Sequence, residues 1–175
     1  GEEYPHEARW PLLYLGAVEG LAEEYEASTR NLTKLLEIYA EPANPEEREI
    51  TVMAALHLGM NAKFRRDLGE ALPWFTRVID SEDMNHIPTA VAHLAELHYW
   101  LDDKPKAARL YEQILEMSED PEYVAEAAYR VSEFLVESTD PVDTPRVIAL
   151  LERTLGSSFT AFHADARALL ARLRP

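Results

Sequence analysis

Three segments of the sequence share one arrangement of small and bulky side chains. In each, a small residue is followed twelve positions later by a second small residue, and sixteen positions later by Leu, Phe or Tyr. The three sets are Gly16, Ser28 and Leu32; Gly59, Ala71 and Phe75; and Ala95, Ala107 and Tyr111. Two helices that cross closely need small residues at the crossing and a larger residue one turn away to fill the groove. The arrangement therefore predicts a repeated hairpin of two helices.

Apolar residues recur at helical spacing along nearly the whole chain, and no segment shows the alternation of strands joined by hairpin turns. Asn, Asp or Thr precedes Pro at Asn44-Pro45, Asp120-Pro121 and Thr144-Pro145, which marks helix starts. The sequence predicts eight or nine helices, over roughly 9–25, 28–40, 46–66, 69–81, 88–101, 105–117, 121–137, 145–155 and 159–173.

These helices pair into four predicted hairpins and one final helix. The hairpins cover approximately 9–40, 46–81, 88–117 and 121–155, and the final helix covers approximately 159–173. Most connections are short, so we expect neighbouring helices to be antiparallel. One hairpin cannot bury both of its faces, and we therefore expect the hairpins to stack into a solenoid that makes residues 1–175 a single domain.

The segments LLYLGAVE…STRNL, AALHLGMNA…ALPWF and VAHLAELH…AARLY resemble the tetratricopeptide repeat (TPR) family, whose pattern is W-x2-L-G-x2-Y…A-x3-F…P. The Trp and Tyr positions are mostly replaced, and the closing Pro is absent or displaced. The small residues Gly16, Gly59, Ala95 and Ala128 lie 43, 36 and 33 residues apart, where about 34 is usual. The resemblance covers about residues 9–155. It implies an all-α fold, a right-handed α-solenoid of about four hairpins, with the last segment as a C-terminal capping helix.

The chain is strongly acidic, with 32 Asp and Glu against 17 Lys and Arg and a formal net charge of −15. Such a surface repels nucleic acid and anionic membranes and favours a basic partner. No apolar run approaches the roughly 20 residues of a membrane-spanning helix, so no direct membrane insertion is expected. Residues 1–50 contain twelve acidic and four basic residues, which indicates either a solvated helix face or an acidic docking surface. No signal peptide is visible, which favours the cytoplasm, although a chain that starts without Met leaves open an export signal or lipid anchor.

His93, Glu96 and His98 form an H-x-x-E-x-H triplet, which raises the question of a metal site. Successive helical residues are about 100° apart, so His93 and His98 lie about 140° apart around the helix, too far for one ion. We expect His98 to pack between helices, and no metal or other cofactor is predicted. The chain contains no cysteine, no phosphate-binding glycine loop and no G-x-S-x-G motif, so an enzyme is not expected.

The repeat register predicts that partners bind on the inner, concave face of the solenoid. Its predicted members are Trp10, Tyr14, His57, Met60, Phe64, His93, Glu96, Tyr99, Trp100, Glu126 and Tyr129. Aromatic and Met side chains are typical of recognition surfaces. The hypothesis is therefore a peptide or helix of another protein, apolar or basic, with Glu96, Glu126 and Glu133 selecting positive charge.

Two alternatives to this hypothesis stay open. In the first, some of these side chains pack inside the solenoid or against the capping helix. In the second, the chain is an assembly or regulatory module, which forms a homo-oligomer or packs on a neighbouring domain through the ends of the solenoid.

Overall fold

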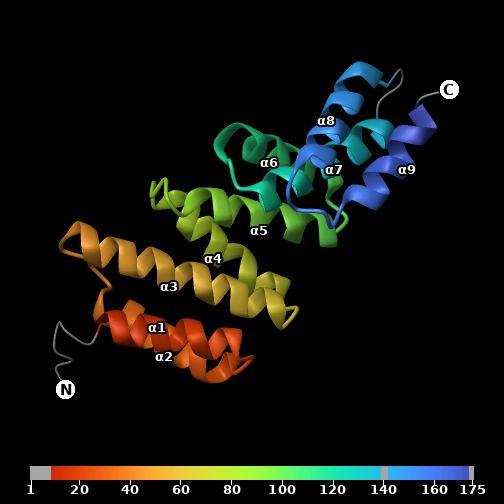
Figure 1. Ribbon diagram of the computed structural model, residues 1–175. Coiled ribbons are helices and arrows are strands. Elements are labelled where there is room, and N and C mark those ends of the chain that lie inside the picture. Colours follow the sequence, from red (N-terminus) through yellow and green to blue (C-terminus); the bar gives the residue numbers. More distant parts are fainter. Residues whose placement is uncertain (1–8, 139–141, 174–175) are drawn as a thin grey trace. The chain divides into compact units, whose positions relative to one another are not determined.

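The structure is a computed structural model that describes residues 9–138 and 142–173. Within these residues it contains nine helices and no strand (Figure 1). The helices are α1 Arg9–Leu21, α2 Tyr25–Ile38, α3 Pro45–Phe64, α4 Leu68–Asp80, α5 Ile87–Trp100, α6 Lys104–Met117, α7 Pro121–Ser138, α8 Thr144–Gly156 and α9 His163–Leu173. Every end lies within about four residues of the predicted one, and the all-α class is confirmed. The connection between α7 and α8 falls partly outside the described residues.

The chain divides into two compact units, and the boundary between them lies inside α5. The first unit ends at His93 and the second begins at Leu94. The prediction of a single domain stays a prediction, and each unit is described by itself. In the described ranges, no helix combines the length and the apolar character needed to cross a bilayer.

Several helix starts carry side-chain caps: Asn44 caps α3, as the sequence predicts, whereas α8 is capped by Asp143 and not by Thr144. Asn44 Oδ1 accepts a hydrogen bond of 2.9 Å from the Glu47 amide, and Glu47 Oε2 accepts one of 2.7 Å from the Ala43 amide. At the starts of α4, α6 and α8, the side chains of Asp67, Asp103 and Asp143 accept the equivalent bond from the backbone amides of Glu70, Lys106 and Arg146. These bonds satisfy amide groups that the first helical turn leaves without an intrahelical partner.

The turns after α1, α3 and α5 share one backbone conformation. Glu23, Arg66 and Asp102 have φ values of 63°, 64° and 60°, in the left-handed region that costs a residue with a side chain roughly 1–2 kcal/mol. They are 43 and 36 residues apart, the same distances that separate the small residues of the first three hairpins. The repeat therefore extends into the turns, although no Gly or Asn marks these positions in the sequence.

The close helix crossings predicted from the small residues are present in the first unit. A Cβ atom added to Gly16 would lie 2.7 Å from Leu32 Cδ2, and one added to Gly59 would lie 2.7 Å from Phe75 Cε1. Ser28 stands at the first crossing, where its hydroxyl donates to the Gly16 carbonyl oxygen at 2.6 Å. Larger side chains at these positions would push the two helices of each hairpin apart.

The helices α1, α2 and α3 lie side by side (Figure 1). A shared core and a buried polar network hold them together. The buried core residues are Leu13, Leu32, Leu35, Leu36, Ile50, Ala54 and Leu58. Asn61 Nδ2 donates to Ser28 Oγ at 2.6 Å, and Ser28 in turn donates to Gly16. Because the network is buried and one residue comes from each helix, it fixes how α3 lies against α1 and α2.

In the second unit, α7 packs against both α6 and α8, and α8 packs against α9 (Figure 1). The buried residues of α7 are Val124, Ala125, Ala127, Ala128, Val131, Ser132 and Leu135. The three alanines allow neighbouring helices to approach closely. At one such approach Thr154 Oγ1 of α8 donates to the Ala125 carbonyl oxygen at 3.3 Å.

Candidate functional site

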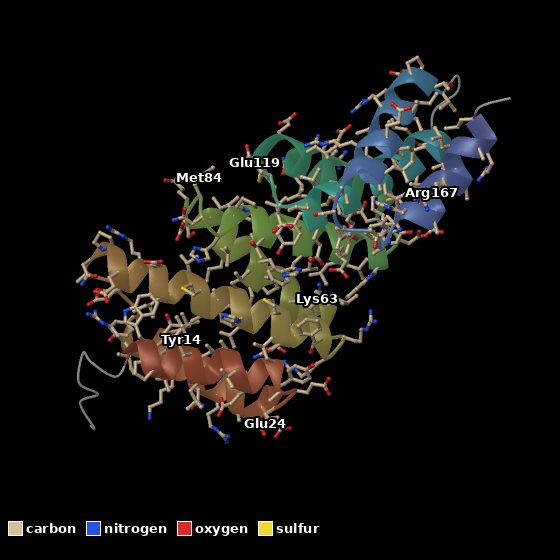
Figure 2. The ribbon with its side chains drawn as sticks, viewed as in Figure 1. Tyr14, Glu24, Lys63, Met84, Glu119 and Arg167 are labelled. Carbon is tan, nitrogen blue, oxygen red and sulfur yellow. The ribbon has the colours of Figure 1, made fainter. Side chains whose placement is uncertain are left out.

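One side of α1 carries large apolar side chains that are exposed to solvent. Tyr14, Val18 and Leu21 are 59%, 60% and 79% exposed, and their spacing of four and three residues puts them on one face of the helix. The opposite side is buried through Leu13 and Gly16. An α-helix that is apolar on both sides is normally covered on both sides. We call Tyr14, Val18 and Leu21 the α1 surface; Tyr14 is labelled in Figure 2.

A pocket of about 200 Å³ adjoins this surface, between α1 and α3. It is lined by Ala17, Gly20, Leu21, Glu23, Tyr25, His57, Met60, Asn61 and Phe64. Phe64 is 50% exposed, and its ring stacks on Tyr25 with the ring centroids 6.4 Å apart. A mostly apolar lining with a few polar groups is typical of sites that receive a ligand or a partner's side chain. We call this the α1–α3 pocket.

Five of the predicted binding residues lie in this part of the first unit. His57, Met60 and Phe64 line the α1–α3 pocket. The Trp10 ring stacks on Tyr14 with the centroids 5.9 Å apart, which extends the α1 surface to the start of the helix. Trp10 Nε1 donates to a Glu46 carboxylate oxygen at 2.8 Å, so this ring is held in place. The repeat register assigned most of these aromatic and Met residues to its binding face, whereas Val18 was not among its predictions.

The pocket lining contains few polar side chains, among them His57, Asn61 and Glu23. Burial lowers the pKa of His57 below its usual value, and the nearby His86 lowers this pKa further. The imidazole of His57 is therefore neutral near pH 7. Asn61 is held by its hydrogen bond to Ser28. Apart from His57, Glu23 is the only acidic or basic residue that lines the α1–α3 pocket.

His93 packs within the first unit. Its ring lies against Phe75 with the ring centroids 5.2 Å apart, and its Nδ1 atom is 3.1 Å from Lys63 Nζ. Lys63 is itself buried and occupies the last turn of α3, where a cation interacts favourably with the helix dipole. The repeat register assigns His93 to the binding face, but in the structure its ring contacts Phe75 and Lys63.

His98 is buried, as predicted. Its Nδ1 atom lies 3.3 Å from Asp103 Oδ2, at the start of α6. Burial lowers the pKa of His98 and Lys106 lowers it further, while Asp103 opposes both effects. Among the described residues, no group of three His, Cys, Asp or Glu side chains could hold a metal ion.

In the second unit, three aromatic rings surround Arg130 of α7, a residue that the repeat pattern did not indicate. Arg130 Cζ lies 4.0 Å from the centre of the Tyr99 ring and 5.4 Å from that of Phe162. The Tyr129 ring is 5.6 Å from the same atom and stacks on Phe162. A guanidinium group over aromatic rings is a favourable cation–π arrangement.

Two carboxylates complete this arrangement, which we call the Arg130 cluster. Glu133 Oε2 lies 3.2 Å from Arg130 Nη1 and accepts a hydrogen bond of 3.2 Å from the Tyr99 hydroxyl. Glu126 Oε1 lies 3.7 Å from Arg130 Nε and accepts a hydrogen bond of 3.0 Å from the buried Tyr111. Both carboxylates are thus engaged by groups of the protein itself.

The tyrosines of the Arg130 cluster stay protonated well above neutral pH. Burial raises the pKa of Tyr129 to about 12, with Glu133 and Asp165 adding to the effect. Burial likewise raises the pKa values of Tyr99 and Tyr111. Each phenol therefore remains a hydrogen-bond donor to its carboxylate.

The Arg130 cluster unites three of the predicted binding residues, Tyr99, Glu126 and Tyr129, around a central cation. Two further predicted binding residues, Glu96 and Trp100 of α5, are half-buried and also interact with other groups of the protein. One signal could have indicated Arg130: it is the sole basic residue of α7, with Glu126 four positions before it and Glu133 three after it.

Comparison with known proteins adds a likeness in fold. No family model matches the chain, and no curated protein sequence matches it. The chain is similar to the crystal structure of a proposed protein-binding protein from Bacteroides ovatus ATCC 8483, with a TM-score of 0.53 and 14% sequence identity. The similarity covers 94% of this chain and 95% of that chain. At this identity the likeness shows a shared helical fold over nearly the full length.

Proposed function

We propose that this chain is a non-enzymatic protein-binding module that takes a peptide or helix of another protein on the α1 surface and in the α1–α3 pocket. The observation that carries the proposal is the exposure of Tyr14, Val18 and Leu21 beside an open, mostly apolar pocket. Covering one such side chain contributes roughly 1.5–3 kcal/mol. A partner that covers all three and fills the pocket gains several kcal/mol toward offsetting the cost of association.

The chemistry of the polar groups supports a binding role over a catalytic one. Asn61 of the pocket has no ionisable group, and Glu133 of the Arg130 cluster is engaged in hydrogen bonds within the protein. A general acid or base needs a free position for the proton that it transfers. The Bacteroides ovatus protein is described as a proposed protein-binding protein, which agrees with the same role.

The proposal includes a TPR-like right-handed solenoid, with the predicted binding residues along its inner face. The close crossings at Gly16 and Gly59 support it, as do the left-handed turn residues that recur 43 and 36 residues apart. Small-angle X-ray scattering tests the shape. A profile that fits a right-handed solenoid is expected, and one that fits a closed helical bundle would contradict this part of the proposal.

Binding measurements on the full chain test the role itself. The immobilised chain captures partners from a lysate of its source organism, and each captured protein is then purified and titrated. We expect the double variant Leu21→Gln, Phe64→Gln to weaken a direct partner by at least about tenfold, because two anchoring side chains are lost. Met84→Gln is the matched control, since Met84 is 69% exposed and lies outside both sites (Figure 2).

Two results would contradict the binding role of this surface. In the first, partners bind the double variant as tightly as the unaltered chain. In the second, sedimentation shows a concentration-dependent dimer that the double variant abolishes, which would assign the α1 surface to self-assembly.

A further inference from the structure

A charged hollow borders the α1–α3 pocket. This hollow of about 550 Å³ is lined by Glu23, Glu24, Tyr25, Glu26, Ala27, Arg30 and Arg65. It shares Glu23 and Tyr25 with the α1–α3 pocket. The hollow contains three carboxylates and two cationic side chains. One of the cations, Arg65, is already paired with Glu70, so Arg30 is the other cation that can balance the three carboxylates. An apolar site thus borders directly on an acidic one.

The fold gives only a partial reason for these acidic residues. Glu26 lies in the first turn of α2, where a carboxylate interacts favourably with the helix dipole. Glu24 is the N-cap residue of α2, yet its side chain makes no capping hydrogen bond. Glu23 follows the C-terminal end of α1, where the helix dipole disfavours a negative charge and where the last turn contains no basic residue. Glu23 and Glu24 are exposed, and Glu24 is labelled in Figure 2.

The geometry of the α1 surface favours a helix as the occupant. Tyr14, Val18 and Leu21 form a straight apolar stripe about 10 Å long, since seven residues of helix rise by roughly that distance. A second helix can pack its own apolar stripe along this ridge and place a side chain in the adjoining pocket. Basic residues that flank its stripe would then lie over the acidic hollow.

Charge also decides between another protein and a second copy of this chain. Residues 1–93 contain seventeen acidic and eight basic residues, so two copies that meet through this unit would repel each other. A basic helix is attracted by the same charges and is drawn to the site faster at low salt.

We propose that the α1 surface and the α1–α3 pocket bind the apolar face of a basic amphipathic helix of another protein, with Lys or Arg side chains of that helix over Glu23 and Glu24. This inference rests on the proposed protein-binding function and adds the chemistry of the partner. It also gives the bound helix an orientation, with its basic flank at the turn between α1 and α2.

Two synthetic peptides of 18 residues test the inference on the full chain. Both carry the same leucine stripe, and the positions that flank it are Lys in one peptide and Glu in the other. Fluorescence anisotropy in dilute salt should show that the Lys peptide binds at least about tenfold more tightly, and this preference should fall as salt is added.

Matched charge variants locate the source of that preference. Glu23→Lys with Glu24→Lys should reverse it, and Glu23→Gln with Glu24→Gln should reduce it without placing a cation at the start of α2. Glu37→Lys with Glu41→Lys changes the net charge equally at exposed positions away from the pocket, and this control should keep most of the preference. Circular dichroism and thermal unfolding verify that each variant is folded.

The possible failures separate the two proposals. If the Lys and Glu peptides bind equally well but Leu21→Gln weakens both, the site binds helices and the basic partner is wrong. If the control variant lowers the preference as much as the Glu23 and Glu24 variants do, overall charge is responsible and the inference is wrong. If Leu21→Gln leaves binding unchanged, or neither peptide binds, both the inference and the proposed site fall.

Discussion

The close approach at Gly59 depends on a missing side chain. The Phe75 ring occupies the space where a Cβ atom of residue 59 would lie, at 2.7 Å from Cε1. Phe75 is fully buried, so the ring cannot move aside into solvent. One hydrogen atom in place of a methyl group thus sets how closely α3 and α4 approach.

Gly59→Ala should therefore destabilise the protein by about 1–3 kcal/mol, the usual cost of overfilling a packed interior. Gly156→Ala is the matched control, because a Cβ atom there would have no neighbour within 4 Å. We expect that variant to change the free energy of unfolding by less than about 0.5 kcal/mol. Chemical denaturation measures both, and equal effects would contradict the close approach.

In the Arg130 cluster, one guanidinium group contacts both aromatic rings and carboxylates. A lysine at position 130 would keep the charge but lose the planar group that lies 4.0 Å from the Tyr99 ring centre. Its ammonium group could not pair in the same way with Glu133 and Glu126. The resulting loss would leave two carboxylates less well compensated in a half-buried place.

Arg130→Lys should lower the free energy of unfolding by about 1–3 kcal/mol. Arg146→Lys should change it by less than about 0.5 kcal/mol, because Arg146 pairs with Glu112 between side chains that are 50% and 41% exposed. Urea denaturation of the two variants compares them directly. A loss that is no larger for Arg130→Lys would show that the ring contacts contribute little.

At the scale of helices and turns, the helix hairpins could be predicted from the sequence because the residues that start a helix lie next to one another in the chain. The proline and capping residues that start α3 and α8 act within one helical turn, so each start could be predicted from a few adjacent residues. The left-handed turn residues were not predicted, because Glu, Arg and Asp occupy places where Gly would have been the usual signal.

Neighbouring substitutions in the turn between α5 and α6 should have opposite effects. Asp102→Gly should stabilise the protein by about 0.5–1 kcal/mol, since glycine adopts a φ of 60° without strain. Asp103→Ala should destabilise it by about 1 kcal/mol, because the hydrogen bond from the Lys106 amide to the Asp103 side chain is lost. Thermal unfolding measures both shifts, and the same sign for both would contradict the assigned turn conformation.

At the scale of the whole molecule, the half-buried His57 and the buried His98 should make stability depend on pH. The fold lowers the pKa values of His57 and His98, mainly through burial. Below about pH 6.5 the unfolded chain therefore binds protons more readily than the folded chain at these two positions. Their contribution to stability is present above that pH and is lost as the pH falls toward the lowered values.

The melting temperature should accordingly fall between pH 7.5 and pH 5.5. In the double variant His57→Gln, His98→Gln the melting temperature should fall less over this pH range. The variant is nevertheless less stable at pH 7.5, because packing is lost. Calorimetry compares how the melting temperature of the two proteins changes with pH. The same change in both would mean that other groups cause the pH dependence.

The sequence by itself determined the class of the fold, the approximate positions of the helices and the small residues at the first crossings. Helical periodicity, capping and steric size act over a few residues or between two adjacent helices, so they can be read without the rest of the chain. Gly16, Ser28 and Leu32 were identified in this way, and the structure brings them together.

Only the tertiary structure decided which side chains remain available to a partner. The repeat register treats His93 and Tyr14 alike, yet His93 packs against Phe75 and Lys63 while Tyr14 stays 59% exposed. Exposure depends on which helices cover a face and on which charges lie next to it. The guanidinium group of Arg130 lies over the ring of Tyr99, which is about thirty positions earlier in the chain. Neither result follows from local spacing, because both depend on contacts between distant parts of the sequence.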